Sequence, residues 1–375
     1  MGKWVKRKLG ECLTIGNGQD YKHLNSGEIP VYGTGGVMTY VDSFLYDGET
    51  VCIGRKGTIN KPIFHIGKIW TVDTLFYTHS FKDLLPFYAY YVFCAIKWDK
   101  YNEATGVPSL SKETINKIEV TIPSTLSEQR RIASILSSAD KVIDSTQKLI
   151  AKYKSIKQGM MEDLLKPKEG WKKVKLGECL RQKPDYGINA PAVEYDNNLP
   201  TYLRITDITE DGYYSRNDIV SVSSLDALNY KLEDGDLVFA RTGASVGKTY
   251  LYNQKDGILV FAGFLIRVRT DEQIVLSQFF KYQTQTPNYK NWIAANSMRT
   301  GQPGINGNEY GEFTFYIPYQ NDIPDLSEQR RIASILSSID KKIESEEKVL
   351  EKYKNIKKGL MEKLLKENDK KIKTD

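Results

Sequence analysis

The sequence predicts an α+β protein: two globular domains separated by two long helices that pack as an antiparallel coiled coil with pseudo-twofold symmetry. Internal repetition is the first reason for this prediction. The stretch LSEQRRIASILSS occurs twice, and residues 126–166 agree with residues 326–366 at 29 of 41 positions without gaps. The second reason is that WVKRKLGECL at residues 4–13 returns as WKKVKLGECL at residues 171–180. The third is a 3.5-residue apolar period in the helical repeats.

Length and composition agree with a two-domain protein outside the membrane. A chain of 375 residues suits two domains of about 100 to 200 residues. It has no run of about 18 apolar residues to span a membrane, and its first residues lack the apolar region of a secretory signal. We therefore expect a cytoplasmic protein.

Cysteine and histidine usage predicts neither a metal site nor a disulfide framework. The four cysteines stand far apart without a CxxC pair, and the three histidines show no ligand spacing. The net charge of +6 comes from the two helical repeats, which carry +3 and +4. That charge is compatible with a nucleic-acid partner but does not prove one.

The order of the repeats predicts four segments. A globular domain at residues 1–123 precedes a helix at 124–166, and a second globular domain at 167–323 precedes a helix at 324–368. TGVPSLSKETINKIEVTIP before the first helix is echoed by TGQPGINGNEYGEFTFYIP before the second. The interiors of the two globular domains differ much more than their edges.

The apolar seam of the helices follows a spacing of 4, 3, 4, 3 residues, which is typical of a coiled coil. We predict a seam made of Ile135, Ala139, Val142, Leu149, Tyr153, Ile156 and Met160 with Ile335, Ile339, Val349, Tyr353, Ile356 and Leu360. Lys342 and Glu346 interrupt the second copy. Each helix is about 60 Å long at about 1.5 Å per residue.

Short linkers predict the relative direction of the helices. PKEG alone separates the end of the first helix from Trp171, and the second helix is expected soon after Pro318. If the termini of the domain between them are neighbours, as is common, the two helices run antiparallel.

Two loops that follow predicted strands carry the most suggestive polar residues. In the first domain the strand-like GETVCI leads into GRKGTINK, and in the second GDLVFA leads into RTGASVGKT. The second loop lacks the first glycine of a phosphate-binding loop, and the first has no GK[ST]. An arginine at the end of a strand suits bidentate contact with guanine or phosphate, although a solvated turn explains the same pattern equally well.

Catalytic motifs are absent or unconvincing. Asp325 with residues 346–348 imitates a nuclease arrangement, but those residues lie on the predicted helix, and the repeat has Thr146, Gln147 and Lys148 in their place. There is no NPPY or DPPY tetrapeptide of the kind that amino-methyltransferases use. We predict no catalytic residues.

Two variable domains, each followed by an EQRRIASILSSxD helix ending in YKxIKxGxMExLL, resemble the specificity subunit of type I restriction-modification systems. The resemblance covers essentially the whole chain. It implies that each variable domain is a target recognition domain for one half of a bipartite double-stranded DNA site. It further implies that the helices dock two methyltransferase subunits, through which restriction and translocase subunits join, and that the chain itself binds no cofactor.

The expected DNA-binding residues combine the resemblance with the loop motifs. They are Tyr32, Gly33, Arg55, Lys56 and Thr58 in the first domain, and Arg204, Arg241, Thr242, Ser245, Lys248 and Arg299 in the second. We expect them to read or position DNA from the major groove. A helix of about 60 Å would hold the two readers more than one DNA turn apart.

Two other classes of function stay open at this point. The chain could be a coiled-coil scaffold that never reads sequence, in which case replacing its first domain would leave the methylated sequence unchanged. It could also be a stand-alone nucleic-acid enzyme, in which case the purified chain alone would methylate or cut DNA.

Overall fold

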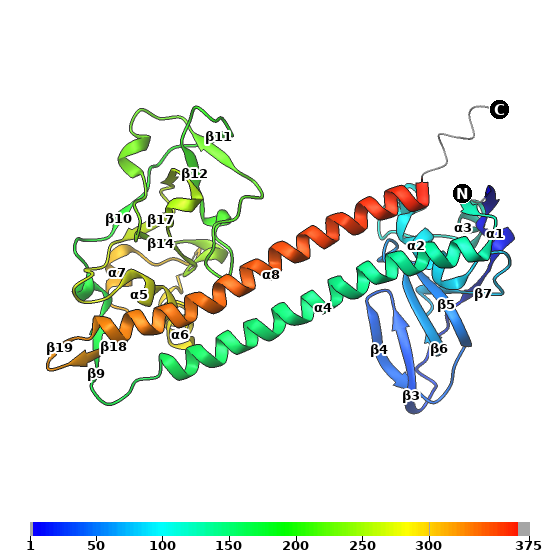
Figure 1. The fold of residues 1–375 in the computed structure, drawn as a ribbon, viewed down its shortest axis with the longest axis horizontal. Helices are drawn as coiled ribbons and strands as arrows, with labels where there is room; N and C mark the ends of the chain where they lie inside the picture. Colours follow the sequence, from blue (N-terminus) through cyan, green and yellow to red (C-terminus); the bar gives the residue numbers. More distant parts are fainter. Residues whose placement is uncertain (1–2, 300, 367–375) are drawn as a thin grey trace. The chain divides into compact units, whose positions relative to one another are not determined.

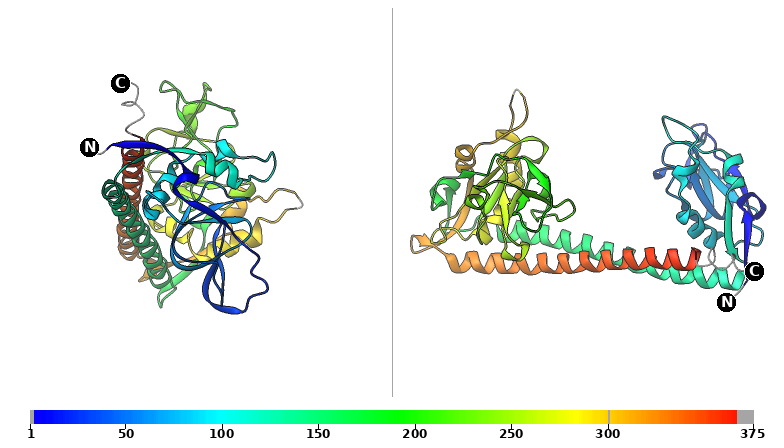
Figure 2. Two further views of the ribbon diagram at one scale, coloured as in Figure 1. Left: turned by 90° about the vertical axis from the view of Figure 1, so that its right-hand side faces the viewer. Right: turned by 90° about the horizontal axis from the view of Figure 1, so that it is seen from above.

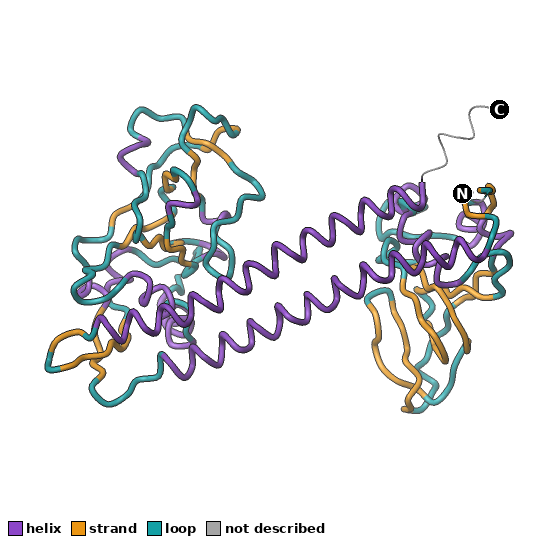
Figure 3. Tube along the Cα trace, viewed as in Figure 1, coloured by secondary structure: helices purple, strands orange, loops and turns teal. Residues whose placement is uncertain are grey.

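The computed structural model describes residues 3–299 and 301–366, and its chain divides into two compact units (Figure 1). Unit 1 comprises residues 1–149 and 346–375, and unit 2 comprises residues 150–345. Each unit contains one globular part and a segment of each long helix. Helices and strands are mixed in both units, as Figure 3 shows.

The duplicated stretches form the two long helices, α4 (Leu126–Leu164) and α8 (Leu326–Lys366). The Asp325 side chain caps the start of α8 by accepting a hydrogen bond of 2.9 Å from the Glu328 amide. The second helix was predicted from residue 324 and begins at Leu326, directly after a hairpin of β18 (Thr314–Gln320) and β19 (Ile323–Pro324). The predicted helix at 324–368 includes residues 367 and 368, which lie outside the described residues.

The helices run antiparallel within each unit, as predicted. In unit 2, Lys342 lies over the Tyr153 ring at 6.0 Å, and Asp340 forms an ion pair of 2.7 Å with Lys157. The step from Tyr153 to Lys157 runs forward along α4, whereas the step between their partners, from Lys342 to Asp340, runs backward along α8. The two helices therefore run in opposite directions. The views in Figures 1 and 2 agree that the two segments of unit 2 lie side by side.

Unit 1 contains the related antiparallel contact, in which Lys357 of α8 forms an ion pair with Asp140 of α4. Lys357 and Asp140 are the repeat equivalents of Lys157 and Asp340. Each unit therefore makes the same ion pair with the roles of the two helices exchanged, as expected from the repeats.

The predicted seam is correct in part. Ala139 and Ile339 are buried, whereas Ile135, Leu149, Tyr153, Met160, Ile335, Val349, Tyr353 and Leu360 are half-buried. The prediction was wrong for Val142, Ile156 and Ile356, which are 37%, 40% and 42% exposed.

A charged residue explains one of these errors. Lys157 takes the inward position next to Ile156, and its side chain is only 12% exposed because it forms the ion pair with Asp340. The side chain of Ile150 is likewise more buried than that of Leu149. The helices also pack on a globular part, so the buried face lies partly one residue beyond the predicted seam.

The globular part of unit 1 is built on a sheet with the strand order β2-β7-β5-β6-β3-β4 and a separate β1-β8 pair. Its strands are β1 (Trp4–Lys8), β2 (Thr14–Asn17), β3 (Ser26–Gly33), β4 (Gly36–Val41), β5 (Tyr46–Gly54), β6 (Ile63–Thr71), β7 (Leu75–His79) and β8 (Glu119–Pro123). Its short helices are α1 (Leu9–Cys12), α2 (Pro86–Ala95), η1 (Trp98–Tyr101) and α3 (Lys112–Lys117).

Unit 2 contains sheets with the orders β10-β17-β14-β15, β11-β13-β12-β16 and β19-β18-β9. Its other strands are β9 (Trp171–Lys175), β10 (Asp185–Tyr186), β11 (Ala192–Glu194), β12 (Thr201–Leu203), β13 (Val220–Val222), β14 (Leu237–Ala240), β15 (Thr249–Leu251), β16 (Leu259–Phe261) and β17 (Leu265–Val268). Its short helices are η2 (Leu176–Cys179), η3 (Ile205–Asp207), η4 (Ala227–Tyr230), η5 (Gly243–Ser245), η6 (Gln254–Asp256), α5 (Ser277–Gln283), α6 (Pro287–Asn296) and α7 (Gly307–Gly311).

The second sequence repeat brings together the two ends of each globular part. β1 pairs with β8 so that Trp4 lies opposite Pro123, and β9 pairs with β18 so that Trp171 lies opposite Pro318. Both pairs are antiparallel and share this register. The assumption that the termini of the domain between the two helices are neighbours is therefore correct, and the first domain shares this arrangement.

A buried glutamine fixes each globular part to the start of its helix. In unit 1, Gln129 accepts a hydrogen bond of 2.8 Å from the Leu85 amide and donates one of 2.9 Å to the Asp83 carbonyl. In unit 2, Gln329 accepts from the Leu276 amide at 2.9 Å and donates to the Ile274 carbonyl at 3.0 Å. Both glutamines are fully buried.

Membrane-spanning helices and clusters of metal ligands are both absent from the described part of the chain. None of its helices is long and apolar enough to cross a membrane. Across residues 3–299 and 301–366, no group of three or more His, Cys, Asp or Glu side chains could hold a metal ion.

Candidate nucleic-acid interface

In unit 1, Arg55 begins a loop that is held in place by backbone hydrogen bonds. The Arg55 amide donates to the Thr74 carbonyl at 2.8 Å, in the turn between β6 and β7. The Gly57 amide donates to the Pro108 carbonyl at 2.8 Å, and the Leu110 amide donates to the Arg55 carbonyl at 2.8 Å. The TGVPS segment at residues 105–109 is thus docked along the arginine loop.

Unit 2 repeats this arrangement bond for bond. The Arg241 amide donates to the Phe264 carbonyl at 3.1 Å, and the Gly243 amide donates to the Pro303 carbonyl at 2.9 Å. The Ile305 amide donates to the Arg241 carbonyl at 2.9 Å. The antiparallel β-bridges between Lys56 and Ser109 and between Thr242 and Gly304 complete the correspondence.

We call these two composite loops the arginine sites. Both the arginine motifs and the TG segments were recognised in the sequence as separate repeats, but their meeting in space was not predicted. Sequence reasoning therefore missed Pro108 and Pro303, which accept the central hydrogen bond, and Thr74 and Phe264, which support the arginines. The matching order of the motifs in both halves was the available signal.

Glycines allow the tight turn of the unit 1 site. A Cβ on Gly54 would lie 2.1 Å from the Thr58 carbonyl oxygen, a distance that no side chain tolerates. Gly57 has φ of +93° and Gly243 has φ of +68°, in the left-handed region that favours glycine. The two arginine sites are consequently rigid loops at strand ends.

The cations of the unit 1 site are open to solvent. Arg55 and Lys56 are exposed and line a hollow of about 540 Å³ together with Val107 and Lys112. The Arg55 guanidinium lies 5.9 Å from the Phe76 ring centre and donates to the Asp73 carbonyl at 3.4 Å. These contacts orient the side chain without neutralising its charge.

In unit 2, the Arg241 guanidinium lies over the Tyr186 ring at 4.9 Å. The Tyr186 hydroxyl accepts a hydrogen bond of 3.1 Å from the Gly307 amide, which also holds the ring at its hydroxyl end. Among the described residues, no ion pair joins Arg55, Lys56 or Arg241 to a carboxylate.

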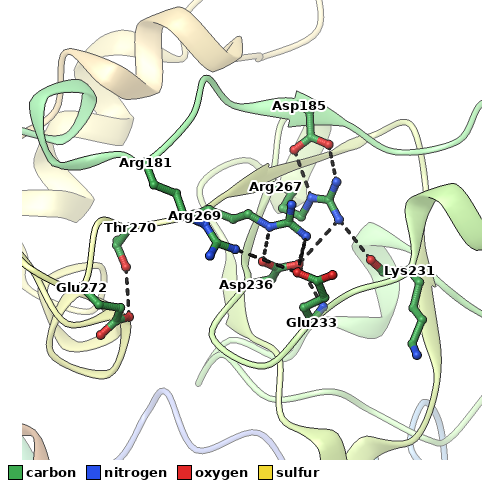
Figure 4. Close-up of polar contacts among 9 residues, drawn as sticks. All are labelled: Arg181, Asp185, Lys231, Glu233, Asp236, Arg267, Arg269, Thr270 and Glu272. Carbon is green, nitrogen blue, oxygen red and sulfur yellow. Dashed lines mark hydrogen bonds and ion pairs between the residues drawn. The ribbon is translucent and has the colours of Figure 1, made fainter.

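An ion-pair network fixes the strand that carries Tyr186 (Figure 4). Asp185 of β10 accepts two hydrogen bonds from Arg267 of β17, at 3.0 and 2.5 Å. Arg269 binds Asp236 at 2.6 Å and Glu233 at 3.0 Å, and Asp236 is 1% exposed. Bidentate pairs of this kind fix geometry as well as charge.

Three other predicted cations are engaged within the protein. Arg204 binds Asp207 at 2.8 Å and Asp218 at 3.0 Å. The hydrogen bonds that Arg204 donates to Asp207, and also to Asp218, outweigh burial and raise the pKa of Arg204. Lys248 forms an ion pair of 2.7 Å with Glu210, and Arg299 forms one of 2.6 Å with Glu309.

The remaining predicted residues support the loops. Gly33 is buried, and a Cβ added at Gly33 would lie 2.6 Å from the Met38 sulfur. The half-buried Tyr32 hydroxyl lies 3.4 Å from His65 Nδ1. Ser245 accepts a hydrogen bond of 3.0 Å from the Lys248 amide through its carbonyl.

Fold and site together define a tandem protein in which two divergent domains carry the same rigid loop and the same helix. The family model described as "Type I restriction modification DNA specificity domain" matches residues 1–155 and 168–355. The chain therefore belongs to this family.

Curated relatives and solved structures agree with this family. The chain is 24% identical over 349 residues to the type I restriction enzyme MjaVIII specificity subunit of Methanocaldococcus jannaschii, covering 86% of this chain and 77% of that protein. It is 22% identical over 333 residues to a putative type I specificity subunit, S.HindORF215P, of Haemophilus influenzae, covering 84% and 81%. Each of these relatives is named as a specificity subunit and not as a catalytic one.

The fold resembles the crystal structure of a type I restriction-modification S subunit from M. genitalium. The TM-score is 0.69 at 16% identity, over 97% of this chain and 96% of that one. A second chain, from a study of assembly and conformational transition of the type I system, gives a TM-score of 0.53 at 13% identity, covering 97% of both. At these identities the likeness concerns the fold.

Proposed function

We propose that this chain is a non-catalytic specificity subunit whose two globular parts each read one half of a bipartite double-stranded DNA site. The observation that carries the proposal is the set of matching backbone hydrogen bonds in the two arginine sites, combined with different side chains around them. A shared frame presents each site to DNA in the same way. The differing side chains allow two different half-sites to be recognised.

The exposed Arg55 and Lys56 and the half-buried Arg241 supply the chemistry that DNA recognition needs. Arg55 and Arg241 lie at rigid strand ends, and an arginine fork matches the O6 and N7 acceptors of guanine in the major groove. Lys56 adds a charge for phosphate contact, which contributes salt-dependent affinity. Thr58 and Thr242 belong to the same loops and complete the proposed contacts.

Some predicted contacts receive a different role in this proposal. Arg204, Lys248 and Arg299 are held by carboxylates, so releasing them to DNA would break an ion pair. We assign them to shaping the loops of unit 2. Tyr32 and Gly33 have the corresponding role in unit 1.

The helices would dock two methyltransferase subunits. Burial explains why Gln129, Ile132 and Leu136 recur in the second helix. It does not explain the identical exposed residues, which are Ser127, Arg130, Arg131, Ser134 and Ser138 with Ser327, Arg330, Arg331, Ser334 and Ser338. A surface kept identical in two places is what two copies of one partner require.

In the proposed complex, the methyltransferase binds S-adenosylmethionine and methylates a flipped adenine, whereas this chain selects the site. Restriction and translocase subunits would join through the methyltransferase. The chain itself needs no cofactor for this role.

Selection from a random DNA pool tests the reading function. The chain assembled with its cognate methyltransferase is expected to enrich a sequence with two defined halves and unread base pairs between them. Enrichment of one continuous motif, or of none, contradicts the proposal. Enrichment of no motif is the result expected of a scaffold that does not read sequence.

Native mass spectrometry tests the docking function separately. Arg130→Glu is expected to reduce the methyltransferase content from two copies to one, and Arg330→Glu is expected to do the same. The double variant is expected to bind none. Two copies retained on the double variant would show that this face of the helices is not the docking surface.

A further inference from the structure

Phe264 is an exposed aromatic residue in an otherwise buried part of unit 2. It lies in the turn between β16 and β17 and is 59% exposed. Ala262 on one side is 5% exposed, and Leu265 on the other is fully buried. Packing within unit 2 therefore gives no account of a phenylalanine at this position.

The position of Phe264 in the arginine site is fixed by the backbone. Its carbonyl accepts the hydrogen bond of 3.1 Å from the Arg241 amide, so the two residues are neighbours in space. In unit 1 the same bond joins the Arg55 amide to the Thr74 carbonyl at 2.8 Å. Phe264 and Thr74 thus occupy equivalent places, next to the arginine of each site.

The two arginine sites consequently differ at a defined point. Unit 2 presents a large apolar ring beside Arg241, whereas unit 1 presents a small, half-buried threonine beside Arg55. Tyr186, which carries the Arg241 guanidinium, is also 40% exposed. Unit 2 therefore combines a guanidinium with an exposed apolar surface.

We infer that Phe264 is a specificity-determining residue of unit 2 and contacts the C5-methyl group of a thymine in the half-site that this unit reads. The inference rests on the proposed function. In the major groove, the C5-methyl of thymine is the apolar group that a base edge offers. Arg241 would read a neighbouring guanine. Phe264 would add a preference for A·T through its large exposed ring, which the small, half-buried Thr74 does not offer in unit 1.

Replacement of thymidine by deoxyuridine, which lacks only the C5-methyl, tests the contact. The probes are duplexes of the selected bipartite site with one deoxyuridine at each thymine position in turn, bound by the chain assembled with its methyltransferase. For the wild type we expect about a fourfold loss of affinity at one thymine of the unit 2 half-site, as burial of one methyl group predicts.

The Phe264→Ala variant shows whether the Phe264 ring makes the contact with the thymine methyl group. It is expected to bind the thymidine duplex more weakly and to lose nothing further with deoxyuridine at that position, because the two changes remove the same contact. Phe264→Leu is expected to retain part of the methyl preference. Deoxyuridine in the unit 1 half-site is the internal control, and its effect is expected to be unchanged by Phe264→Ala.

The contradicting results are distinct from one another. The inference fails if the wild type tolerates deoxyuridine at every position of the unit 2 half-site, or if that half-site contains no thymine. It also fails if Phe264→Ala and deoxyuridine lower affinity independently, since the ring would then act by another contact, such as insertion between base pairs. Absence of any sequence preference in the wild type would instead contradict the proposed function.

Discussion

The carboxylate of Asp340 on α8 lies 2.7 Å from the ammonium group of Lys157 on α4, and the two side chains are 8% and 12% exposed. The Tyr282 hydroxyl donates a hydrogen bond of 2.8 Å to the same carboxylate. Burial, and then the charge of Asp340, raise the pKa of Tyr282, so the hydroxyl stays protonated and donates. This cluster joins both helices of unit 2 to its globular part.

Asp340→Asn is expected to destabilise unit 2 by about 3 kcal/mol, because it leaves a buried ammonium group without its carboxylate. Unfolding by urea, followed by tryptophan fluorescence, measures the effect. Asp140→Asn is the matched variant in unit 1, where the pair is more exposed at 22% and 33%. We expect that variant to lower the free energy of unfolding by only about 1 kcal/mol. Equal losses for the two variants would contradict the claim that burial makes the Asp340 pair the more important one.

The stability of unit 2 is expected to depend on pH through Asp340. Burial acts to raise the pKa of this carboxyl, but Lys157 and then Lys281 outweigh burial and hold the pKa below its usual value. The stabilisation is therefore fully present above pH of about 4 and is lost as the pH falls through the lowered pKa. Urea midpoints between pH 2.5 and 6 should show the wild type losing its advantage over Asp340→Asn at the acid end, and a constant difference would disagree with this account.

Arg241→Ala is expected to weaken recognition of the unit 2 half-site by about 5- to 150-fold, the effect of losing one bidentate base contact of about 1 to 3 kcal/mol. Arg55→Ala should do the same to the unit 1 half-site. Each variant serves as the control for the other, because the untouched half-site keeps its preference. Competition binding with duplexes altered in one half at a time measures both, and equal loss on both halves would indicate a phosphate contact instead.

Gly54→Ala is expected to impair the unit 1 site without touching DNA itself. The added Cβ would meet the Thr58 carbonyl oxygen, so the loop that carries Arg55 and Lys56 must shift. Gly35→Ala is the control, since nothing lies within 4 Å of its Cβ position. Binding to the unit 1 half-site should fall about tenfold or more for Gly54→Ala only. Similar affinity for both variants would show that the loop conformation is unimportant.

Much of the architecture could be predicted because it depends on repetition and period. The duplicated segments gave the helices, their antiparallel direction and the paired domain ends, which all follow from chain connectivity. The pattern could not distinguish Ile156 from Lys157 as the inward residue, since apolar periodicity does not register a buried cation that is paired across helices. The carboxylate that decides the matter, Asp340, is remote in sequence.

The candidate site could be predicted only in its separate parts. Both arginines were identified from strand-loop motifs, but the docking of the TG segments on them depends on tertiary structure. Asp207, three residues after Arg204, was a local signal in the sequence that this arginine forms an ion pair. Asp218 is farther along the chain and gave no such signal. The equivalence of Phe264 and Thr74 was hidden because the interiors of the two domains have diverged.

Exchange of one globular part tests the central claim most directly. Residues 1–123 would be replaced by the corresponding domain of another specificity subunit, and methylated adenines would then be sequenced across the genome of a host that supplies the methyltransferase. We predict a new first half-site joined to the unchanged second half-site. An unaltered methylated sequence, or the loss of both halves together, would contradict the claim that each globular part reads its own half.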